Sequence, residues 1–251
     1  MGSKTRKIVL ASLLVLAGSL TAARAASDAT PDAEVDVDAD APVTRSFQTT
    51  DGTKYTYLLV SPAQVEKDKA YPVLIALPPG NQKRAMADWM LRTYWTTEAR
   101  RRGWIVVTPL RSGTDLVFER NRGHFVELVQ HLSKALRIEG KKVHLAGVSN
   151  GGMSSFRAAT AHPELVHSVM TLPGFPPSES DFGRLDRLKK IPVTMYVGAG
   201  DKDWVPQMER TRDDLVKAGG KVSLTIMPGE GHVIRSLGGG GTLFDVLDRT
   251  R

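Results

Sequence analysis

A serine, an aspartate and a histidine occur in this order along the chain, each shortly after an apolar run with the composition of a β-strand. The serine, Ser149, lies in the glycine-bracketed pentapeptide 147–151 (GVSNG), between the apolar run 142–146 and a helix-like segment. This arrangement is typical of a nucleophile elbow, a strained strand-to-helix turn that holds the hydroxyl above the sheet. Glycine is needed two residues before and after the serine, because side chains there would collide. The pattern therefore predicts Ser149 as a nucleophile.

A serine hydroxyl attacks only when a base accepts its proton and a carboxylate orients that base. His232 follows the predicted strand 221–227, and Asp201 follows the predicted strand 191–197. Both side chains are expected near Ser149, because the carboxyl ends of parallel strands lie at one edge of a sheet. Asp203 is the alternative acid, and Asp201 is favoured because it lies closer to the end of its strand. The other histidines do not follow the acid loop and are expected at packing or surface positions: His124, His131, His144, His162 and His167.

Two backbone N–H groups are expected to stabilise the oxyanion that forms during acyl transfer. One belongs to Asn150, the residue after the nucleophile. The other is expected in the loop 78–82 (PPGNQ), which follows the predicted strand 71–77. Its two prolines carry no N–H, so Gly80 and Asn81 are the first donors there, and we predict Asn81.

The elements that must position these residues alternate between strand and helix after an N-terminal hairpin. Two strand-like runs, 44–50 and 53–60, flank the turn pair Asp51-Gly52. Further strands are predicted at 71–77, 104–110, 143–148, 167–172, 191–197 and 221–227, and helices at 85–102, 120–137, 152–161, 205–218 and 242–249. This order predicts an α/β fold with a mostly parallel, doubly wound sheet, helices on both faces and an antiparallel hairpin at the N-terminal edge. The short segment between strands 167–172 and 191–197 predicts that no cap domain is present.

The chain is predicted to begin with a cleavable signal peptide at residues 1–25. Three basic residues precede the apolar run 8–20, and Ala23-Arg24-Ala25 fits a cleavage site. This run is shorter than the ~20 residues that cross a bilayer, so no stable membrane anchor is expected after cleavage. Residues 26–42 are acidic with few large apolar side chains, which predicts a disordered spacer. Residues 43–251 would then form the catalytic domain of a periplasmic or secreted protein.

Composition excludes several classes of chemistry. The 251 residues contain no cysteine, which excludes disulfides and thiol catalysis. Neither a His-Glu-x-x-His segment nor a phosphate-binding loop is present, so no metal and no cofactor are expected. The formal charge of +7 becomes +9 without the four basic residues of 1–25 and the six acidic residues of 26–42. No basic motif with interleaved aromatic residues accompanies this charge, so no nucleic-acid partner is expected.

Four segments together resemble the α/β-hydrolase superfamily: residues 77–81 (LPPGN), 147–153 (GVSNGGM), 198–201 (GAGD) and 228–232 (PGEGH). The resemblance extends over roughly residues 47–251. It is greatest to compact secreted esterases of the polyhydroxybutyrate-depolymerase, feruloyl-esterase and dienelactone-hydrolase-like groups. Members often have His-Gly where this chain has Pro79-Gly80. Dienelactone hydrolases use a cysteine nucleophile, so that activity is not expected with Ser149.

The residues and the resemblance together predict an exported serine hydrolase that cleaves carboxylic esters through an acyl-enzyme on Ser149. An uncapped site suits bulky esters with polymeric or aromatic acyl groups. Met153, Phe175 and Trp204 are expected to contact such a substrate, with the loop 111–115 as a further wall. Two alternatives use the same three residues, namely an acyltransferase and a peptidase. The alternative from another class is a hydrolase-like binding protein without turnover.

Overall fold

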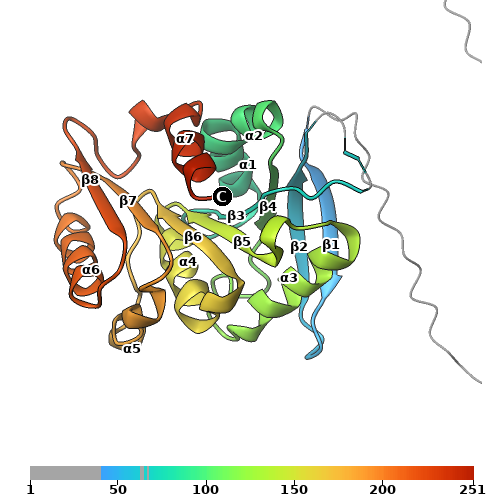
Figure 1. Cartoon of the computed structure of the whole chain (residues 1–251), viewed down its shortest axis with the longest axis horizontal. Coiled ribbons are helices and arrows are strands. Elements are labelled where there is room, and N and C mark those ends of the chain that lie inside the picture. The colour runs from blue at the N-terminus through green and yellow to red at the C-terminus, as the bar shows by residue number, and fades with distance from the viewer. Residues whose placement is uncertain (1–40, 63–64, 67) are drawn as a thin grey trace, which may run out of the picture. The chain divides into compact units, whose positions relative to one another are not determined.

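The computed structural model describes residues 41–62, 65–66 and 68–251. The predicted signal peptide, residues 1–25, lies outside the described residues, as does the predicted spacer up to residue 40. Within the described part of the chain, no helix is long and apolar enough to cross a membrane. The described residues build one eight-stranded sheet with helices on both faces (Figure 1).

The sheet has the strand order β1-β2-β4-β3-β5-β6-β7-β8. Strands β1 and β2 pair antiparallel, β2 pairs antiparallel with β4, and the remaining neighbours are parallel. The predicted hairpin therefore forms and lies at one edge of the sheet, as expected. The strands are β1 (Val43–Gln48), β2 (Lys54–Val60), β3 (Val73–Leu77), β4 (Ile105–Pro109), β5 (Val143–Gly147), β6 (Val166–Thr171), β7 (Val193–Gly198) and β8 (Val222–Met227).

Helices cover the sheet in two layers. Helices α1, α2 and α7 lie over one face, and α3, α4 and α6 lie over the other (Figure 1). The α-helices are α1 (Arg84–Met90), α2 (Thr96–Arg102), α3 (Gly123–Ala135), α4 (Asn150–Ala161), α5 (Glu179–Phe182), α6 (Val205–Lys217) and α7 (Gly241–Arg249). Shorter turns are the π-helix η1 (Leu91–Trp95) and the 3-10 helices η2 (Glu139–Lys141), η3 (Pro163–Leu165), η4 (Leu185–Leu188) and η5 (Arg235–Leu237).

The central strands are apolar because helices bury both of their sides. All five residues of β3, of β4 and of β5 are buried. The edge strand β1 instead alternates between partly buried and exposed side chains over most of its length. Two apolar clusters result, one under α3, α4 and α6 and one under α1, α2 and α7. This core fixes the carboxyl edge of the parallel strands, where the predicted site residues lie.

Two local features differ from the expected elements. The helix expected over residues 85–102 is interrupted by the π-helix η1, which separates α1 from α2. The helix after the predicted elbow begins at Asn150, two residues earlier than its sequence pattern indicates. Between β6 and β7 the chain forms only α5 and η4, which leaves this connection short.

Candidate active site

Ser149 lies on the turn between β5 and α4, in a backbone conformation that non-glycine residues rarely adopt. Its φ is +56°, inside the left-handed region where side chains are strained. A Cβ on Gly147 would overlap the Gly151 carbonyl, and a Cβ on Gly151 would overlap the Leu77 carbonyl. The Ser149 N–H donates to the Pro173 carbonyl at 2.9 Å. Close approach of these backbones therefore requires both glycines and fixes the serine on its turn.

The structure brings Ser149, His232 and Asp201 into one chain of hydrogen bonds, which we call the serine chain. The His232 Nε2 lies 2.8 Å from the Ser149 Oγ, and the Nδ1 lies 2.6 Å from an Asp201 carboxylate oxygen. With Nδ1–H donating to the carboxylate, Nε2 is free to accept the serine proton. The Asp201 side chain is 11% exposed and that of His232 is 41% exposed. Asp203 is exposed on the same loop, and the His232 Nδ1 forms its hydrogen bond with Asp201 instead.

The acid loop and the histidine loop meet because their backbones approach each other closely. A Cβ on Gly198, at the end of β7, would overlap the Gly231 carbonyl. The Gly200 N–H donates to the Glu230 carbonyl at 2.9 Å. The Asp201 carbonyl in turn accepts the first N–H groups of α6 at 3.0 Å. The start of α6 and the glycine contact thus decide which carboxylate faces the imidazole.

The histidine loop is also held from its other side. The Glu230 carboxylate accepts the N–H groups of Ser236 and Arg235 at 2.8 and 3.0 Å. Hydrogen bonds from the Ser236 side chain and from these two N–H groups lower the pKa of Glu230. The hydroxyl of Tyr94, in the π-helix η1, donates a hydrogen bond to the Ile234 carbonyl at 3.2 Å. Burial raises the pKa of Tyr94 to about 12, so the phenol remains a donor. Neither role is visible in the sequence: Glu230 lies in the segment 228–232 without a local signal for its backbone partners, and Tyr94 lies in no recognisable motif.

The loop after β3 lies against the first residue of α4. The Asn150 Nδ2 donates to the Gly80 carbonyl at 2.9 Å. The Asn150 N–H is among the first of its helix, where backbone donors have no acceptor within the helix. The C=O and N–H of a trans peptide point in opposite directions, and the Gly80–Asn81 peptide is trans. Because its carbonyl faces the Asn150 side chain, its N–H, which belongs to Asn81, points away from that side chain. The structure therefore places the loop after β3 beside Asn150, through the Gly80 carbonyl.

Gln82 fixes this loop and was not identified from the sequence. Its side chain is fully buried, although its φ is +54°. The Nε2 donates to the Ser154 Oγ at 3.2 Å, and the Oε1 accepts the Val117 N–H at 2.6 Å. Its carbonyl accepts the Arg111 N–H at 2.9 Å. Gln82 thus connects the oxyanion loop, α4 and the predicted wall loop 111–115, a role that only the folded chain defines.

The predicted substrate residues lie beside the serine chain. The Trp204 ring stands edge-on to His232 with ring centroids 4.8 Å apart, and Phe175 packs edge-on against Trp204 at 4.9 Å. Met153 is half-buried on the first turn of α4, and its N–H donates to the Ser149 carbonyl at 3.1 Å. An aromatic wall therefore borders the imidazole on the side of α6.

A second hydroxyl–histidine–aspartate chain, the tyrosine chain, lies under the turn between β1 and β2. The Tyr55 hydroxyl is 2.9 Å from the His124 Nδ1, and the His124 Nε2 is 2.7 Å from an Asp51 carboxylate oxygen. A hollow of about 440 Å³ opens between this turn and the residues 112–116.

The other histidines also occupy packing or surface positions; His144, for example, is buried with its Nδ1 2.8 Å from the Ser168 Oγ. In the described ranges, no three His, Asp or Glu side chains are grouped so that they could hold a metal ion.

No protein-family model matches the chain. Dipeptidyl-peptidase 5 from Porphyromonas gingivalis is 25% identical over 130 residues, which are 47% of this chain and 19% of that protein. The chain thus spans about a fifth of this curated relative.

Solved structures resemble the chain over most of its length. A thermostable esterase matches with a TM-score of 0.61 and 19% identity, covering 75% of this chain and 55% of the esterase. A dipeptidyl aminopeptidase IV-like protein from Bacteroides ovatus matches with a TM-score of 0.64 and 18% identity, covering 84% and 35%. S-formylglutathione hydrolase from Agrobacterium tumefaciens matches with a TM-score of 0.63 and 14% identity, covering 82% and 93%. With its strand order and its serine turn between β5 and α4, this chain has the α/β-hydrolase fold.

Proposed function

We propose that this protein is a serine hydrolase that cleaves carboxylic esters through an acyl-enzyme on Ser149. The observation that carries the proposal is the serine chain, with hydrogen bonds of 2.8 and 2.6 Å that connect the hydroxyl, imidazole and carboxylate. The hydroxyl stands on a strained turn at the N-terminus of α4, where the helix dipole favours developing negative charge. These are the groups that activate a serine for acyl transfer.

The proposed reaction has two halves. The Ser149 Oγ attacks the ester carbonyl carbon while the His232 Nε2 accepts the hydroxyl proton, and Asp201 stabilises the imidazolium. The oxyanion accepts hydrogen bonds from the Asn150 N–H and from an N–H of the loop after β3, with Asn81 as our choice. Collapse of this intermediate expels the alcohol, which takes the proton from His232. Water then attacks the acyl-enzyme, with His232 again as base, and releases the carboxylic acid.

The known relatives support a hydrolase, and their coverage favours an ester over a peptide bond. The chain covers 35% of the dipeptidyl aminopeptidase IV-like protein and 19% of Dipeptidyl-peptidase 5. It covers 93% of the S-formylglutathione hydrolase, so this likeness extends over nearly a whole enzyme. The aromatic wall of Phe175 and Trp204 suits a bulky or aromatic acyl group, because such rings bury large apolar area. The signal-peptide features of residues 1–25 support export to the periplasm or the medium.

Reaction with a fluorophosphonate probe and hydrolysis of p-nitrophenyl esters test the proposal. The expected result is stoichiometric labelling at Ser149, located by peptide mass spectrometry. Replacing the nucleophile in Ser149→Ala is expected to lower kcat by about 10⁴- to 10⁶-fold. The circular dichroism spectrum of the variant should match that of the wild type. Unchanged turnover by folded Ser149→Ala would contradict the assignment, and a well-folded protein without labelling or turnover would support the binding-protein alternative.

Two further substrates separate the alternatives that share the serine chain. Added short-chain alcohol diverts the acyl group to a new ester if the protein is an acyltransferase, whereas a hydrolase yields mostly acid. Dipeptidyl p-nitroanilides report a peptidase. We expect ester hydrolysis to exceed both activities. A panel of p-nitrophenyl esters with acetyl, octanoyl and aromatic acyl groups would then define the preferred acyl part.

A further inference from the structure

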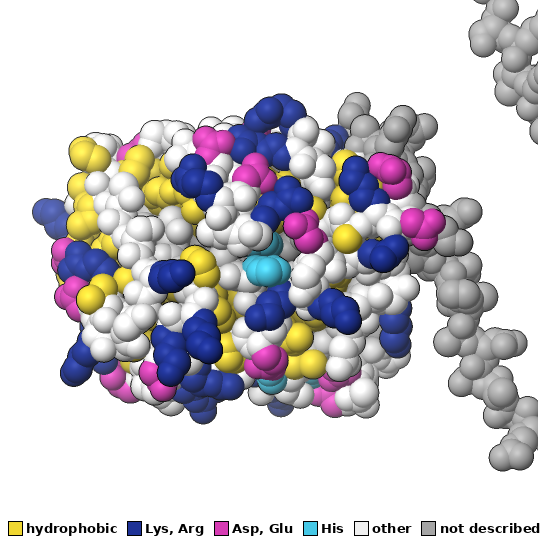
Figure 2. Space-filling model, viewed as in Figure 1, with side chains coloured by type: hydrophobic (Ala, Val, Ile, Leu, Met, Phe, Trp, Pro, Cys, Tyr) yellow, Lys and Arg dark blue, Asp and Glu magenta, His cyan; other side chains and the backbone are white. Residues whose placement is uncertain are grey.

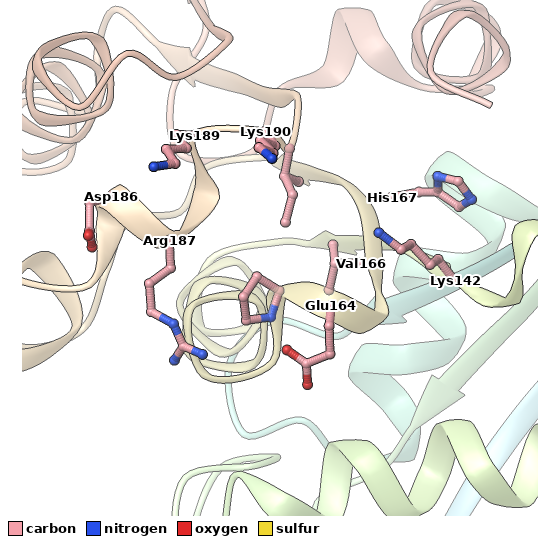
Figure 3. A pocket seen from close by; sticks show the side chains of 10 residues that line it. Lys142, Glu164, Val166, His167, Asp186, Arg187, Lys189 and Lys190 are labelled. Atoms are coloured by element: carbon pink, nitrogen blue, oxygen red, sulfur yellow. The ribbon is translucent and has the colours of Figure 1, made fainter.

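A basic recess lies at the edge of the sheet opposite Ser149. It is a hollow of about 420 Å³ at the amino ends of β5, β6 and β7 (Figure 3). Lys142 precedes β5, Val166 begins β6 and Ile191 precedes β7. The parallel strands run from this edge to the edge that holds the serine chain. The recess is therefore separated from the candidate active site by the length of the strands.

Four cationic side chains surround the recess: Lys142, Arg187, Lys189 and Lys190. Glu164 and Asp186 are its acidic members. The lysine amines of the recess form no ion pair with any residue of the described ranges, and Glu164 is paired with His162 at 3.3 Å. Basic side chains are also numerous on the face shown in Figure 2, with acidic and apolar groups between them. An excess of unpaired positive charge in a hollow favours an anion.

Among the four cationic side chains of the recess, Arg187 is held in place by a hydrogen bond. One of its guanidinium nitrogens donates to the Thr160 carbonyl at 2.6 Å, near the C-terminal end of α4. This contact holds the planar group while its remaining N–H donors are left for a bidentate contact, the geometry that suits phosphate oxygens. In the view of Figure 3, Lys142 and Arg187 lie on opposite sides of Val166, with Lys190 above them. An anion between them would contact charges from several directions.

The base of the recess is apolar. Val166 is 1% exposed and Ile191 is 6% exposed, and Pro163 lies beside them. His167 adds no charge at neutral pH, because burial and the nearby Lys142 lower its pKa. The volume is in the range of pockets that hold small organic ligands, and exceeds the volume of an inorganic phosphate. The recess thus has room for a dianion together with a small uncharged organic group.

We propose that the basic recess binds a phosphate monoester of a small polyol or sugar. The phosphate group lies between Arg187, Lys142 and Lys190, and the carbon skeleton occupies the rest of the hollow. A monoester carries about −1.5 to −2 charges at pH 7, which matches a site with four cations and two carboxylates. The same phosphate chemistry occurs in a soluble metabolite and in the headgroup of phosphatidic acid. The proposal is independent of ester hydrolysis.

Isothermal titration with sn-glycerol 3-phosphate and with inorganic phosphate, on the full-length protein, tests the recess. We expect saturable binding of glycerol 3-phosphate, weaker binding of inorganic phosphate, and loss of at least about tenfold in affinity in Lys142→Gln/Lys190→Gln. The matched control Lys134→Gln/Lys217→Gln removes two exposed charges elsewhere and should bind like the wild type. Absence of saturable binding, equal weakening in both double variants, or equal affinity for inorganic phosphate would overturn the proposal.

Vesicles distinguish the two sources of the phosphate group. Cosedimentation with phosphatidic acid vesicles that glycerol 3-phosphate does not displace would overturn a soluble ligand in the recess, whereas displacement would support it. Arg187→Lys keeps the charge but removes the planar fork, so we expect it to bind several-fold more weakly. Hydrolysis of p-nitrophenyl esters should be unchanged in Lys142→Gln/Lys190→Gln, and Ser149→Ala should still bind glycerol 3-phosphate. Failure of one proposal is thus separable from failure of the other.

Discussion

The serine chain and the tyrosine chain contain the same groups in the same order, with nearly equal lengths. The hydroxyl–imidazole distances are 2.8 and 2.9 Å, and the imidazole–carboxylate distances are 2.6 and 2.7 Å. Their histidines differ in orientation and exposure. His232 turns its Nδ1 to the carboxylate and is 41% exposed, whereas His124 turns its Nε2 to the carboxylate and is 3% exposed. Hydrogen-bond length alone therefore does not separate them.

The backbone that carries each hydroxyl separates the two chains. Ser149 stands on a turn with positive φ before the first N–H groups of α4. Tyr55 lies within the regular strand β2, opposite Phe47, and is 5% exposed. Burial and the Asp51 carboxylate raise the pKa of Tyr55 to about 12, which keeps the phenol protonated. A hydroxyl–histidine–aspartate chain can serve as a reaction site when its hydroxyl is accessible and backbone N–H donors lie beside it.

The largest difference in ester hydrolysis is expected between two variants that each neutralise one carboxylate of the acid loop. Asp201→Asn should lower kcat/KM for p-nitrophenyl esters by about 10⁴-fold, because the imidazole loses its orienting carboxylate. Asp203→Asn is the matched control and should change kcat/KM less than about threefold, since that side chain is exposed and the His232 Nδ1 bonds to Asp201. Steady-state kinetics of both variants decide the point. Equal losses, or a greater loss in Asp203→Asn, would show that the serine chain is misassigned.

A third pair, His144 with Ser168, extends the comparison to a fully buried histidine. Burial lowers the pKa of His144 to about 3, from about 6.5 in the unfolded chain. Between these values the unfolded state binds the proton and the folded state does not. Stability is therefore lost as the pH falls from about 6.5 toward 3, by up to about 1.4 kcal/mol per pH unit from this group.

Urea unfolding of the wild type and His144→Gln at pH 7, 6, 5 and 4 measures this contribution. The wild type should be the more stable protein at pH 7, and its advantage should shrink as the pH falls. The difference between the two proteins removes the contribution of other titrating groups. A pH-independent difference in the free energy of unfolding would contradict a buried neutral His144.

Removing the imidazole of the tyrosine chain should affect stability and leave catalysis nearly intact. His124→Gln is expected to lower the free energy of unfolding by about 2–4 kcal/mol, because the buried Tyr55 hydroxyl loses its partner. Ester turnover per folded molecule should stay within about threefold of the wild type. Chemical denaturation and active-site titration give the two quantities. A loss of turnover comparable to that of Asp201→Asn would break the distinction between the two chains.

The smallest effect is expected from the support of the histidine loop. Tyr94→Phe removes the hydrogen bond to the Ile234 carbonyl and should lower kcat about three- to tenfold with little change in KM. Such a split indicates a positioning residue, since substrate binding is left intact. Tyr196→Phe, which removes the hydroxyl of another buried tyrosine, is the control and should leave kcat unchanged. If both variants lower kcat equally, the effect comes from the loss of a buried tyrosine hydroxyl in general and not from the hydrogen bond to the histidine loop.

The sequence by itself determined the order of elements and the elbow. Apolar runs with fixed spacing define buried strands, and the pair Asp51-Gly52 defines the hairpin, because these preferences are local. The elbow is recognised within five residues, because glycines bracket Ser149. Gly147 avoids an overlap with the Gly151 carbonyl nearby, whereas Gly151 avoids one with the Leu77 carbonyl of the neighbouring strand. The chain order of the serine, an acid loop and a histidine loop also predicted which strand ends would meet.

Only the tertiary structure decided between Asp201 and Asp203, since the two residues share one loop and one charge. The choice follows from the start of α6 and the contact between Gly198 and Gly231. Burial of Gln82 and the hydrogen bond from Tyr94 to Ile234, 140 residues away, likewise join distant segments. The basic recess is assembled in the same way from the amino ends of three strands. Local sequence patterns cannot encode such contacts, because they exist only when the sheet aligns strands that are far apart in the chain.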